Sequence, residues 1–468
     1  MEFLAKAITV SNDILWSYVL VVMLIALGLW FSLRTGFVQL RLFGEMLRLL
    51  REGVSHEGGK AHISSFQAFC ISTASRVGVG NIAGIAIAIV TGGPGAIFWM
   101  WVIAVIGAAS GFVESTLAQI YKVRDPRTFG FRGGPAYYIR NCLGSKSAAA
   151  LFAVLISVTF GLCFNSVQAN TITLSLESTF GLDRALGGAC ITILSAIVIF
   201  GGLKRIAHLS SWLVPVMATL YLFIALIIVI LNITAIPAMF ATIVSQAFSP
   251  DAAIGGIGAA ILTGAKRGLF SNEAGMGSVP NAAATAFVSH PVKQGLVQAL
   301  GVFVDTLLVC TASACIVLLY DGYADTGKTG IELVQMALAS HMGSVAGVLL
   351  SFMVFLFAFS SIAGNYYYGE SNIQFFSTRP GLLLVFRVLV VAMVAFGSVA
   401  DLPFVWNLAD LFMALMAIVN LVAIALLGRN AFIALKDYSD QKKAGVPDPV
   451  FHPALLPDRR GIEAWDEK

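Results

Sequence analysis

Long apolar segments separated by short polar ones run through most of this chain. A membrane-spanning α-helix needs roughly 20 apolar residues to cross the hydrocarbon core of a bilayer. The pattern predicts eleven such helices, at residues 14–33, 64–90, 95–121, 148–177, 185–203, 209–232, 252–286, 294–320, 343–371, 381–399 and 403–428. The expected fold class is therefore an all-α, polytopic membrane protein.

Two of these segments carry polar, glycine-rich stretches where a membrane helix should be continuous, at residues 72–81 and 264–277. In hydrocarbon an unpaired peptide group costs several kcal/mol, so unwound backbone survives only where protein buries it or where it lines a cavity. Interruptions at corresponding places in two halves of a chain are typical of the binding sites of secondary transporters. We therefore expect the two breaks to meet and to form a binding site.

The chain beyond its first apolar segment divides into residues 64–232 and 252–428, each with five predicted helices, the first of them broken. An odd number of helices per half reverses the orientation of the second half, which gives an inverted repeat. Residues 1–63 are then an extra N-terminal helix followed by a cytoplasmic linker. The charged segment 429–468, with its four prolines, predicts a loose cytoplasmic tail.

The distribution of charge predicts the orientation. Only 12% of the residues are charged, about half the share typical of soluble proteins. The predicted cytoplasmic loops hold 22 basic residues, and the predicted outer loops hold three, Lys6, Arg184 and Lys328. This bias predicts a multi-pass protein of the plasma (inner) membrane with its N-terminus outside and its C-terminus in the cytoplasm. The net charge of +4 gives no indication of a nucleic-acid partner, and the six scattered cysteines predict neither a metal site nor a cofactor.

A broken helix presents two opposed helix ends to the middle of the membrane. Free N–H groups suit a carboxylate, and free carbonyl groups suit an ammonium group or Na⁺. In the first break, Gly78 and Gly80 permit non-helical backbone, and Asn81 adds an amide. The second break supplies Phe270, which is placed to close over a small side chain. Further substrate-binding positions predicted there are Ser271, Asn272, Gly275 and Met276. The alternative is that glycines such as Gly80 only allow helices to pack closely.

Four motifs, at residues 76–84, 92–102, 267–280 and 366–370, resemble those of the alanine or glycine:cation symporter family, also called the sodium:alanine symporters. The motifs lie in both halves, and the resemblance spans nearly the whole chain. It implies a fold similar to that of the bacterial leucine transporter (LeuT), a five-plus-five inverted repeat, here with one extra helix in front. That expectation agrees with the count of apolar segments.

The resemblance also implies a site for Na⁺. It assigns two backbone carbonyl groups before the first break, those of Ala74 and Val77, as ligands of the cation. It adds two hydroxyl groups from the second half, those of Ser360 and Ser361. Considered by itself, Ser360 is equally well explained by a hydrogen bond back to its own helix.

The resemblance further implies that Gln168 contacts the substrate together with Asn81. One position departs from the family pattern, which leads us to expect Trp directly after Gly364, where this chain has Asn365. An amide in place of an indole predicts a roomier and more polar pocket. Larger polar amino acids, such as glutamine or serine, therefore become candidates beside alanine and glycine.

Several charged residues lie within the apolar segments, where a charge costs roughly 2.5–3.5 kcal/mol on insertion scales. The resemblance to leucine-transporter-like folds implies that Glu114 faces the two breaks, where a carboxylate can accept hydrogen bonds from their free N–H groups. The alternative for Glu114 is a proton carrier, a role that Asp305 would also serve. Arg267 and Glu273 are expected either to pair within the second break or to form part of a gate. Asp410 is expected to anchor a helix end.

These observations predict a Na⁺-coupled symporter that carries a small neutral amino acid by alternating access. Carbonyl and hydroxyl oxygens favour Na⁺, whereas a titratable group in a cavity would favour H⁺, so H⁺-coupled symport is the alternative. A channel, the candidate from another class, is disfavoured because selectivity filters are usually built from repeated subunits. The chain has none of the sequence motifs of a nucleophile, a phosphate loop or a metal centre, so an enzyme is not expected. The expected partners are an amino acid, Na⁺ and the lipid bilayer.

Overall fold

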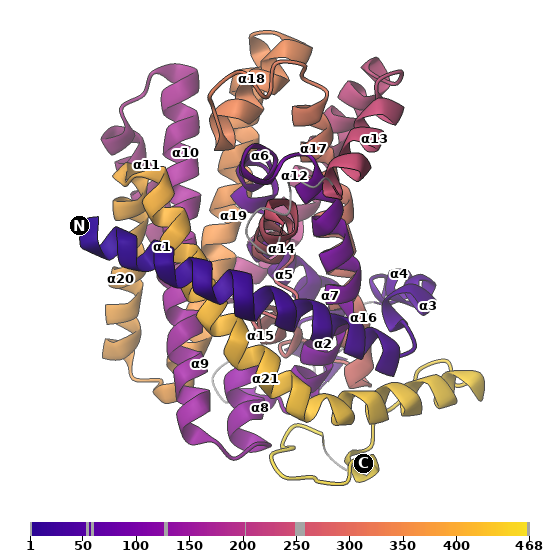
Figure 1. Cartoon of the computed structure of the whole chain (residues 1–468). Coiled ribbons are helices and arrows are strands. Elements are labelled where there is room, and N and C mark those ends of the chain that lie inside the picture. The colour runs from indigo at the N-terminus through magenta and orange to yellow at the C-terminus, as the bar shows by residue number, and fades with distance from the viewer. Residues whose placement is uncertain are drawn as a thin grey trace.

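The structure, a computed structural model, describes residues 2–52, 56–57, 60–125, 130–201, 203–248 and 258–465. The predicted start of the second half, at residue 252, lies outside these residues. The chain begins with one continuous helix (Figure 1), made of α1 (Glu2–Ile14), the π-helix η1 (Leu15–Leu20) and α2 (Val21–Arg34). Two short helices, α3 (Val38–Arg41) and α4 (Phe43–Leu49), follow it.

Residues 60–248 contain α5 (Ser65–Arg76), η2 (Val79–Asn81), α6 (Ala83–Gly92), α7 (Gly95–Ile120), α8 (Pro135–Asn141), α9 (Lys146–Val158), η3 (Thr159–Phe164), α10 (Asn165–Phe180), α11 (Arg184–Ile199), α12 (Leu203–Leu231) and α13 (Ile236–Ala247). Residues 258–465 contain α14 (Ala259–Asn272), α15 (Val279–Ala283), α16 (Pro291–Val302), η5 (Phe303–Cys310), α17 (Thr311–Leu318), α18 (Gly330–Met342), α19 (Val345–Phe376), α20 (Pro380–Val399), α21 (Leu402–Lys443) and η6 (Pro453–Leu455). The predicted halves, 64–232 and 252–428, stay a prediction. Two short hairpins, β1 (His56–Glu57) with β2 (Lys60–Ala61) and β3 (Val123–Asp125) with β4 (Gly130–Arg132), lie in connections.

Among the described residues, eight helices are long and apolar enough to cross a membrane, and each coincides with a predicted span. The other three predicted spans correspond to the two interrupted helices, α5–α6 and α14–α15, and to α11, which has 16 residues. The all-α, polytopic fold class is thus confirmed. The number of eleven membrane crossings stays a prediction.

Helix α14 packs closely on α7 in the middle of the bundle. A Cβ atom added at Gly264 would lie 2.5 Å from the Ala96 carbonyl oxygen and 2.9 Å from Cβ of Trp99, so only glycine fits there. Small residues of this kind let membrane helices approach at backbone distance. The close packing fixes the position of α14, whose last residues lead into the second break.

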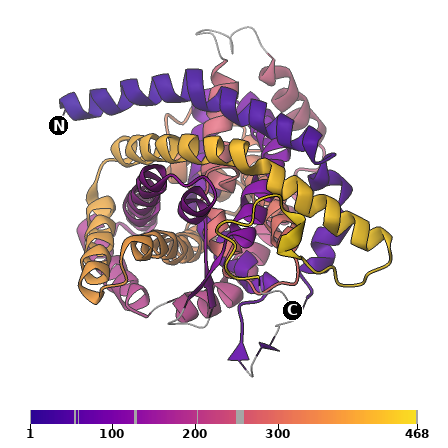
Figure 2. The same ribbon diagram turned by 90° about the horizontal axis from the view of Figure 1, so that it is seen from below.

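The end of the chain differs from the prediction. Helix α21 continues to Lys443, and residues 446–465, which we call the C-terminal strap, fold back across the end of the bundle (Figure 2). Within the strap, Phe451 and Leu456 are only 4% and 3% exposed. The prediction of a loose tail is therefore wrong, because apolar side chains spaced among the charges and prolines dock on the membrane helices.

Glu45 forms an ion pair with Arg48 within α4 and also connects α4 to the far end of α21. The Arg48 Nε atom donates to Glu45 Oε2 at 2.8 Å, and the Tyr438 hydroxyl group donates to the same carboxylate. The hydrogen bond from Arg48 lowers the pKa of Glu45 from 4.5 to about 2, against the opposing effect of partial burial.

Because the pKa of Glu45 is lower in the folded state, its ionised carboxylate stabilises the folded protein. This contribution is complete above pH 4.5 and is lost as the pH falls toward 2. We expect Glu45→Gln to lower the melting temperature of the purified protein at pH 6, and the difference from the parent to shrink toward pH 2. Thermal melts across that range test this. An equal difference at all pH values would contradict it.

Candidate functional site

The first predicted break is present between α5 and α6. Val77 leaves the helix with ψ of 84°, and Gly78 is extended with φ of −133° and ψ of −152°. Side chains pair the freed N–H groups: Asn81 Oδ1 accepts from Gly78 N at 3.0 Å, and Gln168 Oε1 accepts from Val79 N at 3.1 Å. Gln168, predicted to contact the substrate, therefore lies against the unwound backbone itself.

The second predicted break lies between α14 and α15. Glu273, Gly275 and Gly277 have φ of 56°, 84° and 88°, in the left-handed region that favours glycine. Asn272 supports the turn, because its Oδ1 atom accepts from Ala274 N at 3.0 Å while Nδ2 donates to Thr306 Oγ1 at 3.2 Å. Both polar atoms of its amide group are thus hydrogen-bonded within the protein in this conformation.

Glu114, fully buried on α7, holds the second break. Its Oε1 atom accepts from Gly275 N at 3.1 Å, and its Oε2 atom accepts from Gly277 N at 3.1 Å and from Asn420 Nδ2 at 2.7 Å. The expected contact of Glu114 with free N–H groups is confirmed for the second break but not for the first. Gly275 is a predicted substrate-binding position, but its N–H group is hydrogen-bonded to this carboxylate.

Two hydrogen-bonded groups join the breaks to each other. In one, Asn81 Nδ2 donates to Asp305 Oδ1 at 2.6 Å and to Ser271 Oγ at 3.1 Å. In the other, the Ser75 hydroxyl group lies 2.9 Å from Glu273 Oε1 and 2.6 Å from Asn365 Oδ1. The expectation that the breaks meet is therefore confirmed.

Asn365 lies within the continuous helix α19 and is fully buried beside both breaks. Its Oδ1 atom is paired with Ser75, whereas Nδ2 has no hydrogen-bond partner among the residues that the structure describes. A buried donor without a partner is costly. The position predicted to differ from the family therefore presents one unused N–H donor near the centre of the site.

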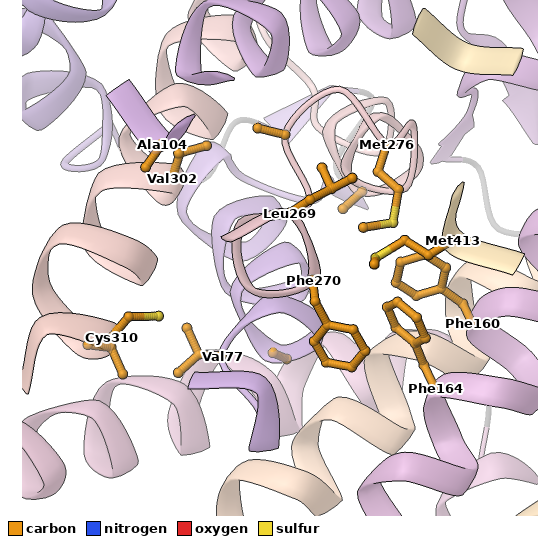
Figure 3. Close-up of a cluster of buried hydrophobic side chains, with 14 of the residues drawn as sticks. Val77, Ala104, Phe160, Phe164, Leu269, Phe270, Met276, Val302, Cys310 and Met413 are labelled. Carbon is orange, nitrogen blue, oxygen red and sulfur yellow. The ribbon is translucent and has the colours of Figure 1, made fainter. Parts of the chain in front are cut away.

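An aromatic cluster covers the first break. The Phe270 ring packs directly on Gly80, where an added Cβ atom would lie 2.6 Å from the ring. Its ring centre lies 4.5 Å from that of Phe164 and 4.8 Å from that of Trp406. Figure 3 shows Phe270 and Phe164 together with Met276, which points into the same cluster. Met276 is thus part of the apolar wall of the site.

Arg267 pairs with Asp410 of α21 and not with Glu273. Lys266 Nζ lies 3.8 Å from the same Asp410 carboxylate, so Asp410 is an ion-pair partner and not a simple helix anchor. The predicted pair within the break is wrong because Glu273, turned by its left-handed backbone, is bound by the hydroxyl groups of Ser75 and Ser278.

The alternative expectation, a gate, agrees with what surrounds the Arg267–Asp410 pair. The Arg267 guanidinium carbon lies 4.9 Å from the ring centre of Trp406. These three residues line a surface pocket that Ile87 of α6 and Thr329, just before α18, also line. The ion pair and the aromatic cluster thus separate this pocket from the first break.

A cluster of oxygen atoms lies where the resemblance implies a cation. The Ser361 hydroxyl group donates toward the Ala74 carbonyl oxygen at 2.9 Å and the Phe357 carbonyl oxygen at 3.0 Å, and Ser360 Oγ lies 2.8 Å from the latter. The Val77 carbonyl group is released from the helix because Asn81 N donates to Gly78 O instead. Neutral carbonyl and hydroxyl oxygens are the donor set that transporters use for Na⁺, so these residues fit the ion.

Sequence reasoning missed two contributors to the centre. The Phe357 carbonyl group belongs to the backbone of an apolar residue, which carries no sequence signal. Cys310, one of the six scattered cysteines, has its Sγ atom 2.9 Å from Ser271 Oγ and 3.2 Å from Asn81 Nδ2. Asp305, expected only as a proton carrier, is likewise hydrogen-bonded to both breaks.

Solved structures with a similar fold include that of MhsT in complex with L-phenylalanine. The match has a TM-score of 0.57 at 14% identity and covers 81% of this chain and 97% of that one. At this identity the likeness concerns the fold alone. It confirms the leucine-transporter-like fold implied by the sequence motifs.

Curated relatives of similar length come from Bacillus subtilis (strain 168). The "Probable sodium/glutamine symporter GlnT" is 54% identical over 465 residues, which cover 99% of this chain and 96% of the relative. The "Amino-acid carrier protein AlsT" is 51% identical over 468 residues, which cover 100% and 99%. The family model described as "Sodium:alanine symporter family" matches residues 1–453. The chain belongs to the sodium:alanine symporter family and is a membrane transporter, not an enzyme.

Proposed function

We propose that the protein couples the entry of Na⁺ to that of a small neutral amino acid, with the two breaks as the shared binding site. The observation that carries this proposal is the pair of hydrogen-bonded groups that joins the breaks, Asn81 with Asp305 and Ser75 with Asn365. Broken membrane helices supply helix ends that suit the two ends of a zwitterion, and here side chains pair several of the freed N–H groups. The aromatic cluster on Gly80 supports an occluded form of this site.

The proposed Na⁺ site consists of the carbonyl groups of Ala74, Val77 and Phe357 and the hydroxyl groups of Ser360 and Ser361. These groups come from α5 in the first half and α19 in the second, so a bound cation joins the two halves. One charge that crosses a 100 mV potential releases about 2.3 kcal/mol. At about 1.4 kcal/mol per decade, this supports roughly 50-fold accumulation of the amino acid.

The proposed substrate site uses the unwound backbone at Gly78 and Gly80, the side chains of Asn81 and Gln168, and the Phe270 ring. Asn365 sets the selectivity through its unused Nδ2 donor, which suits a substrate side chain with an acceptor oxygen. The name of the relative GlnT indicates glutamine, and the name of the family indicates alanine. Uptake of labelled amino acid into proteoliposomes at fixed Na⁺, with a panel of competing amino acids, tests both candidates. Uptake that does not depend on Na⁺ would contradict the coupling.

Replacing Asn365 is expected to change the selectivity. Asn365→Trp places a larger side chain beside Ser75 and Glu273, so the preference for substrates should move toward alanine and glycine. Asn365→Ala removes the donor without filling the space. The apparent affinity for glutamine should therefore fall by about tenfold, and the affinity for alanine should stay nearly unchanged. Competition assays on both variants distinguish the effect of side-chain volume at position 365 from the effect of the lost hydrogen-bond donor. An unchanged order of preference in both would place Asn365 outside the pocket.

H⁺ coupling is the second candidate, and the observation that favours it is the burial of Asp305 and Glu114 at the breaks. Each carboxylate accepts several hydrogen bonds, and neither lies within 4.0 Å of a basic nitrogen atom in the described part of the chain. Uptake driven by a pH gradient in the absence of Na⁺ would support this alternative.

The proposed orientation places the end of the molecule with the C-terminal strap in the cytoplasm of a plasma (inner) membrane. The excess of basic residues in the loops on that side supports this orientation. The pocket beside Arg267 and Asp410 then opens to the outside. Labelling of a cysteine introduced at the exposed residue Lys328 by a membrane-impermeant reagent on intact cells tests the orientation.

A further inference from the structure

The C-terminal strap is an ordered part of the molecule with its own connections. It begins where α21 ends in a left-handed residue, Gly445 with φ of 81°, and Val446 N donates back to the Gln441 carbonyl oxygen at 3.0 Å. The Gln441 side chain then pairs with both backbone groups of Val450, at 2.8 and 2.9 Å. The chain therefore reverses at once and returns across the bundle.

The first anchor of the strap lies at the start of α16. Asp448 Oδ1 lies 2.5 Å from Lys293 Nζ and accepts from Ser289 Oγ at 2.8 Å. Phe451 N donates to the Ser289 carbonyl oxygen at 3.0 Å. The Lys293 side chain, only 4% exposed, is also paired with Glu52 at 3.0 Å. Charge-assisted bonds of this kind are roughly twice as strong as neutral ones.

The second anchor is Trp465. Its Nε1 atom donates to the Gln119 carbonyl oxygen at the end of α7 at 2.9 Å. Its ring packs against a small apolar cluster made of Ala68, Ala286 and Val288. Ala68 belongs to α5, and the other two follow α15. A single side chain thus touches segments that belong to both interrupted helices.

The segments beneath the strap are those that have to separate if the site is to open to this side. Helices α5 and α15 are the halves of the broken helices that point toward this end, and Phe287 N donates to the Ile63 carbonyl oxygen at 3.0 Å where they come together. In alternating access, such elements move apart on the side of release. The strap ties both of them to α7 and α16.

We propose that the C-terminal strap is a latch that holds this end of the transporter closed and must detach in every transport cycle. The inference rests on the proposed function, because it assumes alternating access around the two breaks. A merely structural tail would remain bound while the helices beneath it move. A latch and a structural tail therefore predict different transport activities when the strap is held in place.

A reversible cross-link tests the latch. The backbone hydrogen bond between Phe451 and Ser289 brings these residues side by side, so Ser289→Cys combined with Phe451→Cys should form a disulfide on mild oxidation. We expect the oxidised double variant to lose at least about 90% of its uptake, and a reductant to restore it. Each single variant, treated in the same way, is the control. Full uptake by protein whose cross-link is verified by mass spectrometry would overturn the proposal.

A second measurement needs no transport at all. Ser65, at the start of α5, is 3% exposed and lines one pocket with Asp448 and Lys293. In a Ser65→Cys background, Asp448→Asn and Trp465→Ala should each speed maleimide labelling by about tenfold, as expected when a charge-assisted bond or a buried ring is lost. Arg460→Ala, which removes an exposed pair with Asp458 in the same strap, is the matched control and should leave the rate unchanged.

The labelling result separates this proposal from the proposed function. Equal labelling rates in the parent and in both variants would overturn the latch even if uptake were normal. Faster labelling in a protein that takes up no amino acid would support the latch while contradicting the proposed function. Gel filtration shows whether each variant is folded. If a variant is misfolded, the cross-linking experiment tests the proposal.

Discussion

Replacing Glu114 by alanine is expected to destabilise the protein severely and to abolish transport. The substitution removes the only described hydrogen-bond acceptor of two backbone N–H groups, those of Gly275 and Gly277, and one partner of the Asn420 amide. Each unpaired buried donor costs about 1–3 kcal/mol. We therefore expect the free energy of unfolding to fall by about 2–6 kcal/mol and uptake to fall to background, measured by thermal melts in detergent and by proteoliposome assays.

Two further variants show whether the effect comes from these bonds. Glu114→Gln keeps one acceptor oxygen and should lie between the parent and Glu114→Ala in stability. Ser115→Ala is the matched control, because the Ser115 hydroxyl group on the same helix is buried without a hydrogen-bond partner in the described part of the chain. A Glu114→Ala protein as stable as the control would mean that the second break does not depend on this carboxylate.

Ser361→Ala is expected to raise the Na⁺ concentration for half-maximal uptake by at least about tenfold, the effect of roughly 1.4 kcal/mol of lost cation binding. The reason is geometric: the Ser361 hydroxyl oxygen lies within 3.0 Å of both the Ala74 and the Phe357 carbonyl oxygens, on the two halves of the molecule. Uptake at fixed amino acid, titrated with Na⁺, measures the shift. The maximal rate at saturating Na⁺ should change less than the affinity.

Two other serines of α19 provide comparisons for Ser361→Ala. Ser360 contacts only the Phe357 carbonyl oxygen of this group, so Ser360→Ala should have a smaller effect. Ser371 lies on the same helix, and its hydroxyl group is 3.5 Å from the Tyr368 carbonyl oxygen in its own turn, so Ser371→Ala should leave the Na⁺ dependence unchanged. An unaltered Na⁺ dependence in Ser361→Ala would refute the proposed cation site.

The breaks were predictable from the sequence because their cause is local. Left-handed backbone at Gly275 and Gly277 requires glycine, and a run of glycines and amides within an apolar segment therefore marks the place. The contact of Glu114 with the second break was predictable only with the resemblance to leucine-transporter-like folds, because the need of a buried carboxylate for donors does not say which donors it finds.

The partners of other residues depend on packing between distant segments and could not be predicted. Arg267 and Asp410 are 143 positions apart, and nothing in the local pattern favours this pair over one with Glu273. The Phe357 carbonyl group has no sequence signal at all. The strap was mistaken for a loose tail because three apolar side chains among charged residues and prolines are too few to predict docking.

Helix α21 runs without interruption for 42 residues, about 60 Å at 1.5 Å per residue. Near its start Asp410 holds Arg267, near its middle Asn420 contacts the turn at Gly275, and near its finish Tyr438 contacts Glu45. Because α21 is a rigid helix that is contacted at its centre, a tilt about Asn420 would move its two ends in opposite directions. If α21 tilts in this way during transport, opening of one side of the transporter would close the other without a relay of side chains in between.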